Sequence, residues 1–407
     1  MAAWDVRPTK DLDEFRRAVG AIGHYFGGWP PDEEAARRFS SNLPLDRMHA
    51  AVDGDRIVGG AGAFPFELTV PGGTVRCGGV TVVGVLPTHR RRGILTAMMR
   101  AQLEDVRERG EPVAALWASE EVIYRRFGYG LASLACEIGV PSGYTGLRQA
   151  PDERATARIV PLDSSKDVIA PIYDRVRVGT PGMFARTDTW WETRNLPDPP
   201  DRRQGGGEKN VLVVELDGKP AGYALYRIHS KFESGAAAGH VDVIEAIAEG
   251  PVATRELWRV LLDMDWKATL KAYLLPIDHP LVHQLSYPRR MQMRVGDGLW
   301  LRLVDVGAAL SARAYGGDGP VVLEVEDAFL PENTGRWRIA GGAAERTEDD
   351  ADVVLDVGEL AGPYLGGFDF GELVRSGVAR ELKEGGAARA DAVFLTGSPK
   401  PWCPEIF

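Results

Sequence analysis

The stretch "VVGVLPTHRRRGILTAMMR", Val82–Arg100, decides the fold of the first part of the chain. A run of β-branched residues is followed by a proline, a histidine, three arginines and a glycine. From Ile94 to Val106 apolar residues recur at helical spacing, so the stretch predicts a buried strand, a short basic loop and a helix. The start of a helix offers unpaired N–H groups and the positive end of the helix dipole. The sequence therefore favours an anion at this point.

The loop has features of a diphosphate-binding site. Successive backbone N–H groups from Arg91 to Leu95 can cradle a pyrophosphate, and Gly93 keeps side chains away from the ligand. No Gly-Lys-Ser/Thr follows, so this is not a Walker loop, and one glycine does not make a dinucleotide-binding fingerprint. A solvated basic helix start without any ligand is the plain alternative.

Composition sets limits on the class of protein. A chain of 407 residues is expected to form two or three domains. The net charge of −10 argues against nucleic acid as a partner. It suits cationic substrates, although many cytosolic proteins are acidic for solubility alone. The three scattered cysteines predict neither a disulfide framework nor a zinc site. No signal-peptide pattern and no run of about 18 apolar residues is present, so we expect a cytoplasmic protein without a membrane partner.

The first third of the chain has a mixed order of helices and strands. We expect helices over residues 9–19, with Thr9 as the cap, and over residues 30–39. A hairpin about Asp53-Gly54 follows, and "GGAGAF" at Gly59 indicates a bulge or tight strand packing. After the basic loop and its helix come the strand "VAALWAS" and the short helix "EEVIYRRFGYG".

The second third repeats this pattern. A hairpin about Asp217-Gly218 precedes "VDVIEAIAEGPVATRELWRVLLDM", which repeats strand, loop and helix at the same offset. Where the first copy has residues 89–93, His-Arg-Arg-Arg-Gly, the second has residues 249–253, Glu-Gly-Pro-Val-Ala. The basic loop is absent, so a phosphate-binding role survives at most in the first copy.

The last third has short alternating strands from about residue 300, and one or two helices over residues 362–377. Leu323, Val325, Leu355 and Val357 mark the inward faces of a small α+β domain. The tail "FLTGSPKPWCPEIF" stays apolar and stiffened by proline to its last residue, whereas chain ends are usually polar and loose. This predicts a docked tail.

Several of these motifs resemble those of a known family. Arg90-x-x-Gly93-x-Leu95 is similar to the acetyl-CoA loop of GNAT acetyltransferases, Gln/Arg-x-x-Gly-x-Gly/Ala, with Leu95 where a small residue is usual. "YRRFGY", Tyr124–Tyr129, matches the Tyr-x-x-x-Gly-Tyr/Phe of that fold. Together with "LPTHRRRGIL", "GDGLWLRLVDVGAAL" and a terminal phenylalanine, these make the whole chain resemble the Eis (enhanced intracellular survival) acetyltransferases.

The resemblance implies an α/β (α+β) architecture of tandem GNAT folds. These are an N-terminal GNAT domain (1–145), a degenerate GNAT-like domain (146–300) and a C-terminal domain like a sterol carrier protein (301–407). It also implies a hexamer, acetyl-CoA as cosubstrate without a metal, and acetylation of several amines of one aminoglycoside.

The residue pattern and the family resemblance together indicate the residues of the site. No cysteine or serine with a nearby base is evident, so direct attack of the amine in a ternary complex is favoured. Backbone groups of the strand that holds Val83 and Val85 can pair with pantetheine. The resemblance places Tyr124 beside the CoA sulfur as general acid, although it could merely pack, and makes the carboxylate of Phe407 the base. The expected acetyl-CoA loop is Arg90, Arg91, Arg92, Gly93, Ile94 and Leu95, and the expected substrate contacts are Glu405, Asp32, Phe26 and Trp29.

The leading hypothesis is an acetyl-CoA-dependent N-acetyltransferase for small polycations such as aminoglycosides. A transferase for protein or peptide lysines is the alternative within the enzyme class. A non-catalytic protein that binds CoA and an apolar ligand is the alternative outside it.

Overall fold

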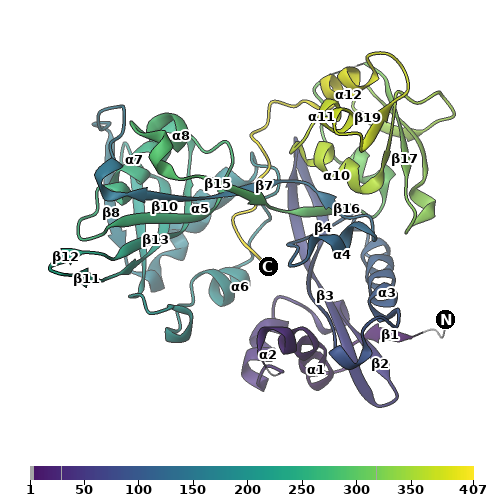
Figure 1. The fold of residues 1–407 in the computed structure, drawn as a ribbon, viewed down its shortest axis with the longest axis horizontal. Coiled ribbons are helices and arrows are strands. Elements are labelled where there is room, and N and C mark those ends of the chain that lie inside the picture. Colours follow the sequence, from purple (N-terminus) through teal and green to yellow (C-terminus); the bar gives the residue numbers. More distant parts are fainter. Residues whose placement is uncertain (1–3, 29, 318) are drawn as a thin grey trace. The chain divides into compact units, whose positions relative to one another are not determined.

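The computed structural model describes residues 4–28, 30–317 and 319–407 (Figure 1). The chain divides into two compact units. The first contains Met1–Ser133, Leu299–Ser398 and Ile406–Phe407, and the second contains Leu134–Gly298 and Pro399–Glu405. Among the described residues, no helix has both the length and the apolar character needed to cross a membrane. Cys77, Cys136 and Cys403 are buried free thiols.

A seven-stranded sheet forms the first domain, with the order β1-β2-β3-β4-β5-β16-β6. The hairpin about Asp53-Gly54 is confirmed, since it joins β2 to β3. The strands are β1 (Asp5–Pro8), β2 (Met48–Asp53), β3 (Arg56–Val70), β4 (Gly73–Val85), β5 (Val113–Leu116), β6 (Gly130–Leu131) and β16 (Trp300–Leu303). The helices of this domain are α1 (Leu12–Gly23), α2 (Glu33–Ser40), α3 (Ile94–Glu108) and α4 (Glu121–Arg125).

Glycines let helices pack closely on both faces of this sheet. A Cβ at Gly60 would lie 2.3 Å from the carbonyl oxygen of Ala18 in α1, and one at Gly59 would lie 3.0 Å from the sulfur of Met98 in α3. Successive strand residues point to opposite faces. α1 and α3 therefore cover opposite faces of β3, as Figure 1 shows. The "GGAGAF" segment thus combines tight packing with a bulge. The bulge is the shift of the β3–β4 register between Gly60 and Gly62.

The first helix is capped differently from the prediction. Asp11, not Thr9, is the N-cap of α1, and its carboxylate accepts a hydrogen bond from the N–H of Glu14 at 2.9 Å. The Thr9 hydroxyl instead donates to the carbonyl of Leu45 at 2.8 Å. Either residue type can cap a helix, so the tertiary contact of Thr9 decides which one does.

A second sheet of seven strands forms the core of the second unit, in the order β15-β7-β14-β13-β10-β9-β8. Its hairpin turns at Asp217-Gly218 as expected. The strands are β7 (Leu134–Pro141), β8 (Ala155–Val160), β9 (Lys209–Leu216), β10 (Lys219–His229), β13 (His240–Ala248), β14 (Thr269–Pro276) and β15 (Arg294–Asp297), with a separate ribbon of β11 (Phe232–Glu233) and β12 (Ala236–Ala237). The helices are α5 (Lys166–Arg177), α6 (Asp188–Trp190), α7 (Gly250–Leu262) and α8 (Leu281–Gln284).

Two strands join a sheet other than the one expected from their place in the sequence. β7 precedes residue 145 yet pairs with β14 and β15 of the second sheet. β16, which we expected to open the C-terminal domain, pairs instead with β5 and β6 of the first sheet. All four residues of β16 are buried, so its apolar pattern suits either sheet and does not reveal the partner.

The last domain is built on a five-stranded sheet in the order β19-β18-β17-β20-β21. The expected inward residues Leu323, Val325, Leu355 and Val357 are all buried. The strands are β17 (Val321–Glu326), β18 (Gly335–Ala340), β19 (Ala343–Arg346), β20 (Val353–Asp356) and β21 (Ala379–Glu381), and the helices are α9 (Val306–Ser311), α10 (Val357–Leu365), α11 (Phe370–Arg375) and α12 (Gly386–Phe394).

Candidate active site

β4 extends beyond the segment that pairs with its parallel neighbour β5 in the first sheet. β4 pairs with β5 only through Cys77–Gly79, whereas β4 continues to Val85. On that side residues 80–85 have no strand partner among the described strands. Val82 has a left-handed φ of 48° where the β3–β4 register shifts. Val83 and Val85 are half-buried in this open segment, which can pair with an extended ligand as an added strand would.

The helix that follows begins without a capping side chain. Gly93 is the N-cap of α3 with φ 84°, and no side chain accepts a hydrogen bond from its first turn. α1 and α2, in contrast, are each capped by an aspartate. The first N–H groups of a helix have no partner within it, so the start of α3 offers donors and a positive dipole end to an anion.

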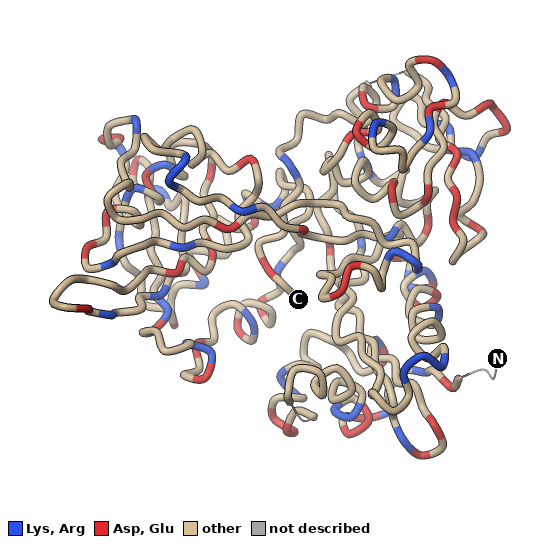
Figure 2. The backbone as a smooth tube through the Cα atoms, viewed as in Figure 1, with Lys and Arg blue, Asp and Glu red and all other residues tan. Residues whose placement is uncertain are grey.

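Three exposed arginines, Arg90, Arg91 and Arg92, precede this helix start. Figure 2 shows the basic segment in the loop before α3. Arg91 has a left-handed φ of 61°, and the carbonyl of Arg92 accepts a hydrogen bond from the indole of Trp4 at 2.8 Å. The loop is therefore held in shape while its side chains face solvent. Ile94 is buried and Leu95 half-buried, so these two residues can offer only backbone groups to a diphosphate.

The segment between α1 and α2 reaches the same end of β4. The Tyr25 hydroxyl donates to the carbonyl of Val85 at 2.6 Å. Phe26 is 76% exposed, which leaves its ring available to a ligand. Asp32 is the N-cap of α2 and accepts a hydrogen bond from Ala35 at 2.7 Å. Trp29 lies outside the described residues.

Tyr124 lies on α4, in one apolar cluster with Leu116 of β5 and with the partly buried Val83 and Leu95. The structure thus brings together the tyrosine, the open strand and the start of α3. Burial, and secondarily the charge of Glu120, raises the pKa of Tyr124 to about 12. The phenol therefore keeps its proton throughout the neutral range and is available as a donor.

A glycine fixes the turn after α4. Gly128 has φ 80°, and a Cβ there would lie 2.3 Å from the buried guanidinium of Arg302. Only glycine adopts this conformation readily and leaves room for the arginine. The glycine of the "FGYG" segment thus has a packing reason.

Phe407 belongs to the first unit, where its ring contacts β3. The ring lies 4.9 Å from that of Phe66 and 6.5 Å from that of Phe64, both edge-to-face. Phe66 in turn covers Gly79, at which a Cβ would lie 2.3 Å from its ring. Gly79 is the last residue of β4 that pairs with β5. The end of the chain is therefore seated where the two strands diverge.

The contact of Phe407 with Phe64 and Phe66 was not predicted from the sequence. Their alternation in "AFPFEL" indicates only that both rings share one face of a strand. Nothing in that pattern shows that the face receives a segment more than 300 residues further along.

The residues just before Ile406 are fixed within the second unit. The Trp402 N–H donates to Pro181 at 2.8 Å, and its indole donates to the carbonyl of Leu274. The Glu405 carboxylate accepts hydrogen bonds from Arg186 at 3.1 Å, Trp190 at 2.9 Å and Asn195 at 3.1 Å. These contacts confirm a docked tail. They give Glu405 a structural role, and its contact with substrate stays a prediction.

The second sheet opens in the same way as the first, but its opening is lined by different groups. β13 pairs with β14 only from His240 to Val243. A cavity of about 590 Å³ lies beyond, and Pro399 and Trp402 of the chain's own tail line part of it. The residue before α7 is Glu249, whose carboxylate is bound by Arg175 at 2.6 Å, whereas three arginines precede α3 in the first copy. The start of α7 thus lacks the cluster of arginines that would attract a diphosphate.

Family comparisons agree with this architecture. Residues 5–132 match a family model of the acetyltransferase (GNAT) domain, and residues 182–303 match a second model of the same description. Residues 306–404 match the sterol carrier protein domain. The expected fold class, tandem GNAT folds followed by a domain like a sterol carrier protein, is confirmed.

Similar proteins span nearly the whole chain. An N-acetyltransferase of Streptomyces avermitilis is 41% identical over 99% of this chain and 99% of its own length. The N-acetyltransferase Eis of Mycobacterium tuberculosis is 33% identical over 90% of this chain and 91% of its own length. The crystal structure of Eis1 from Mycobacterium abscessus superposes with a TM-score of 0.85 at 35% identity, covering 99% of this chain and 100% of that one. The chain belongs to the Eis family of GNAT N-acetyltransferases, enzymes that transfer an acyl group from an acyl-CoA cosubstrate to an amine.

Proposed function

We propose that the first domain transfers the acetyl group of acetyl-CoA to primary amines of small polycations such as aminoglycosides, by direct attack in a ternary complex. Two neighbouring features carry this proposal. β4 has a segment without a partner on its β5 side, and α3 begins after three arginines without a capping side chain. An extended pantetheine arm fits the first feature and a pyrophosphate fits the second. The net charge of −10 suits a polycation.

In this mechanism the β4 backbone, Tyr124 and the terminal carboxylate have separate tasks. Backbone groups near Val83 and Val85 align the thioester, and one N–H polarises its carbonyl. Tyr124 donates its proton to the departing thiolate as the C–S bond breaks. The carboxylate of Phe407 accepts a proton from the substrate ammonium, directly or through a water, so that the free amine can attack, and it also attracts the cationic substrate. A carboxylate is a weak base in water, and apolar surroundings strengthen such a base. We further propose a cytoplasmic homohexamer, on the resemblance to the family.

The function is tested by following thiol release from acetyl-CoA with a panel of amines. We expect release with aminoglycosides and diamines, and more than one equivalent of thiol per aminoglycoside. Larger kcat/KM values for lysine peptides than for every small amine would make the protein-lysine alternative correct. CoA binding without release from any amine would identify a non-catalytic binding protein.

Replacing Gly93 with valine is expected to weaken CoA binding about 10-fold or more. A β-branched residue at a φ of 84° costs about 1–2 kcal/mol of backbone strain, and relieving it would deform the loop. Calorimetry measures the affinity and is also expected to give one CoA site per chain.

Gly250→Val is the matched control for Gly93→Val. Gly250 also has a left-handed φ, 74°, and stands at the start of α7 in the second copy. The control therefore carries the same strain but should leave CoA affinity unchanged. Equal losses in the two variants, or two equivalent CoA sites, would contradict the assignment.

A further inference from the structure

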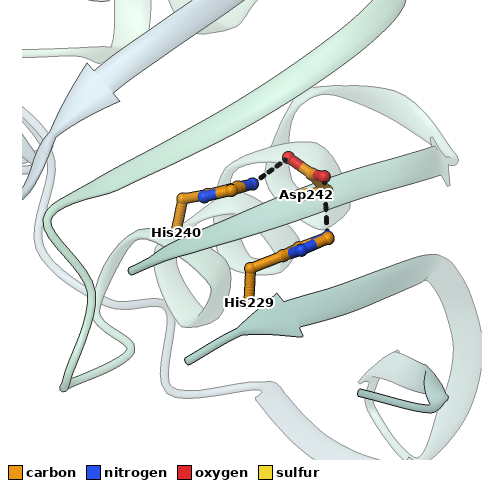
Figure 3. A group of neighbouring side chains, drawn as sticks. All are labelled: His229, His240 and Asp242. Atoms are coloured by element: carbon orange, nitrogen blue, oxygen red, sulfur yellow. Dashed lines mark ion pairs between the residues drawn. The ribbon is translucent and has the colours of Figure 1, made fainter. Parts of the chain in front are cut away.

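Two histidines and an aspartate meet at one end of the second sheet. β10 ends at His229 and β13 begins at His240, and these two residues are direct partners across the antiparallel pair. Asp242 lies two residues further along β13, so its side chain is on the same face as that of His240. Figure 3 shows both imidazoles directed at the two oxygens of this carboxylate.

The spacing of the donor atoms is that of a metal site. His229 Nε2 lies 3.0 Å from Asp242 Oδ2, and His240 Nε2 lies 3.4 Å from Asp242 Oδ1. All three donor groups lie within 4.8 Å of one another. In a tetrahedral zinc site with bonds of about 2.0–2.2 Å, neighbouring donor atoms are about 3.3 Å apart. The rings are stacked with centroids 4.4 Å apart, so a small rotation of each ring brings both nitrogens to one ion.

One atom of the cluster lacks a satisfactory partner. Asp242 Oδ1 is buried and accepts no hydrogen bond from any described residue, because the contact with His240 does not have hydrogen-bond geometry. Buried carboxylate oxygens are normally satisfied by a donor or a cation. A cation between the imidazoles and the carboxylate would satisfy it.

The surroundings leave room for an ion and its fourth ligand. The three side chains remain between 15% and 28% exposed, and His229 and Asp242 line a cavity of about 360 Å³. Arg227 faces Asp242 across the β10–β13 pair but is bound by Asp198 at 2.6 Å. Its charge is therefore already balanced by another carboxylate.

We propose that His229, His240 and Asp242 bind one divalent transition-metal ion of the Zn²⁺ type, with a water molecule in the fourth position. Two imidazoles and one carboxylate suit Zn²⁺, Ni²⁺ or Cu²⁺ better than Mg²⁺ or Ca²⁺, which prefer oxygen ligands alone. The ion would join the last residue of β10 to the first residues of β13 and so hold the base of the segment that carries β11 and β12. It is distinct from the acetyl-transfer site in the first domain.

The sequence does not indicate this site, and we expected no metal. The two histidines are eleven residues apart and match no metal-binding spacing. Only the register of β10 with β13 makes them neighbours.

The test uses the full chain without a histidine tag, stripped of metal and titrated with Zn²⁺ and with Co²⁺. We expect one site per chain at which Co²⁺ gives the intense visible bands of tetrahedral coordination. His240→Gln and Asp242→Asn should each abolish those bands and weaken Zn²⁺ binding by about 10-fold or more. Zn²⁺ should raise the melting temperature of the wild type but not of these variants.

His283→Gln is the matched control, because His283 is an exposed histidine on α8 of the same unit. It should bind Zn²⁺ and Co²⁺ as the wild type does. Circular dichroism and CoA binding verify that each variant is folded. Unchanged Zn²⁺ affinity in folded His240→Gln and Asp242→Asn, or no tetrahedral Co²⁺ spectrum in the wild type, would overturn the proposal and leave a carboxylate in contact with two imidazoles.

Discussion

A Tyr124→Phe variant is expected to bind acetyl-CoA with unchanged affinity and to lose about 10²–10⁴-fold of its turnover, the usual effect of removing a general acid. The substitution removes one hydroxyl and leaves the ring that packs with Leu116 and Val83. Folding should therefore be spared. Turnover is measured by thiol release at saturating acetyl-CoA and amine, and affinity by calorimetry.

The raised pKa of Tyr124 gives this prediction a pH signature. Burial favours the neutral phenol, and a pKa of about 12 means that the proton stays on the oxygen up to roughly pH 11. Wild-type turnover should therefore rise with pH as the amine substrate loses its proton, without a fall up to pH 10. A fall centred below pH 10 that disappears in Tyr124→Phe would show that the phenol ionises far more easily than its buried position implies.

Tyr129→Phe is the matched control for Tyr124→Phe. Its ring lies 5.9 Å from that of Tyr124 in the same cluster, and its buried hydroxyl has no hydrogen-bond partner among the described residues. Removing that hydroxyl should leave turnover within a few-fold of wild type. If the two variants lose the same activity, or if Tyr124→Phe loses only a few-fold, Tyr124 is a packing residue.

The local elements of the site were predictable because their signals lie within a few residues. The period of apolar residues after Gly93 predicts α3, and the structure begins that helix at Ile94. Asp-Gly pairs specify both hairpin turns, since the left-handed φ values that such turns need are easy for glycine. The sequence alone also distinguishes the two copies, because no arginine cluster precedes α7.

Long-range contacts were not predictable in this way. β16 carries an apolar pattern that suits any buried strand, and only the strand pairing in the structure shows that it lies between β5 and β6. The cap of α1 depended on a contact between Thr9 and Leu45, 36 residues apart. The seat of Phe407 on Phe66 joins segments from opposite ends of the sequence. The sequence suggested a docked tail from its composition, but not where it docks.

The position of the terminal carboxylate is expected to have the second large effect on turnover. Adding one glycine after Phe407 is expected to lower turnover by about 10²-fold or more while leaving CoA affinity and melting temperature unchanged. One residue moves the terminal carboxylate by more than ~3 Å, whereas a misplacement of about 1 Å can cost 10²-fold. The ring of Phe407 can stay against Phe66, so folding has no reason to change.

Two further variants separate the carboxylate from the ring. Phe407→Ala keeps a terminal carboxylate but loses the edge-to-face contacts with Phe64 and Phe66. It should lose less turnover than the glycine extension, because the charge stays near its place while its position is less fixed. Deleting Phe407 removes the ring and moves the terminal carboxylate back to Ile406, so it should be as severe as the extension. One glycine added at the N-terminus is the matched control and should have no effect.

The pattern across these variants distinguishes catalysis from packing. A merely structural tail predicts that Phe407→Ala is worse than the extension, since it removes the buried contact and should lower the melting temperature. A catalytic carboxylate predicts the reverse order in turnover with unchanged melting of the extended chain. Trp402 and Glu405 remain bound in the second unit in every variant, so a change in turnover reports on the last residue alone. Full activity in the glycine-extended enzyme would show that the base is another group.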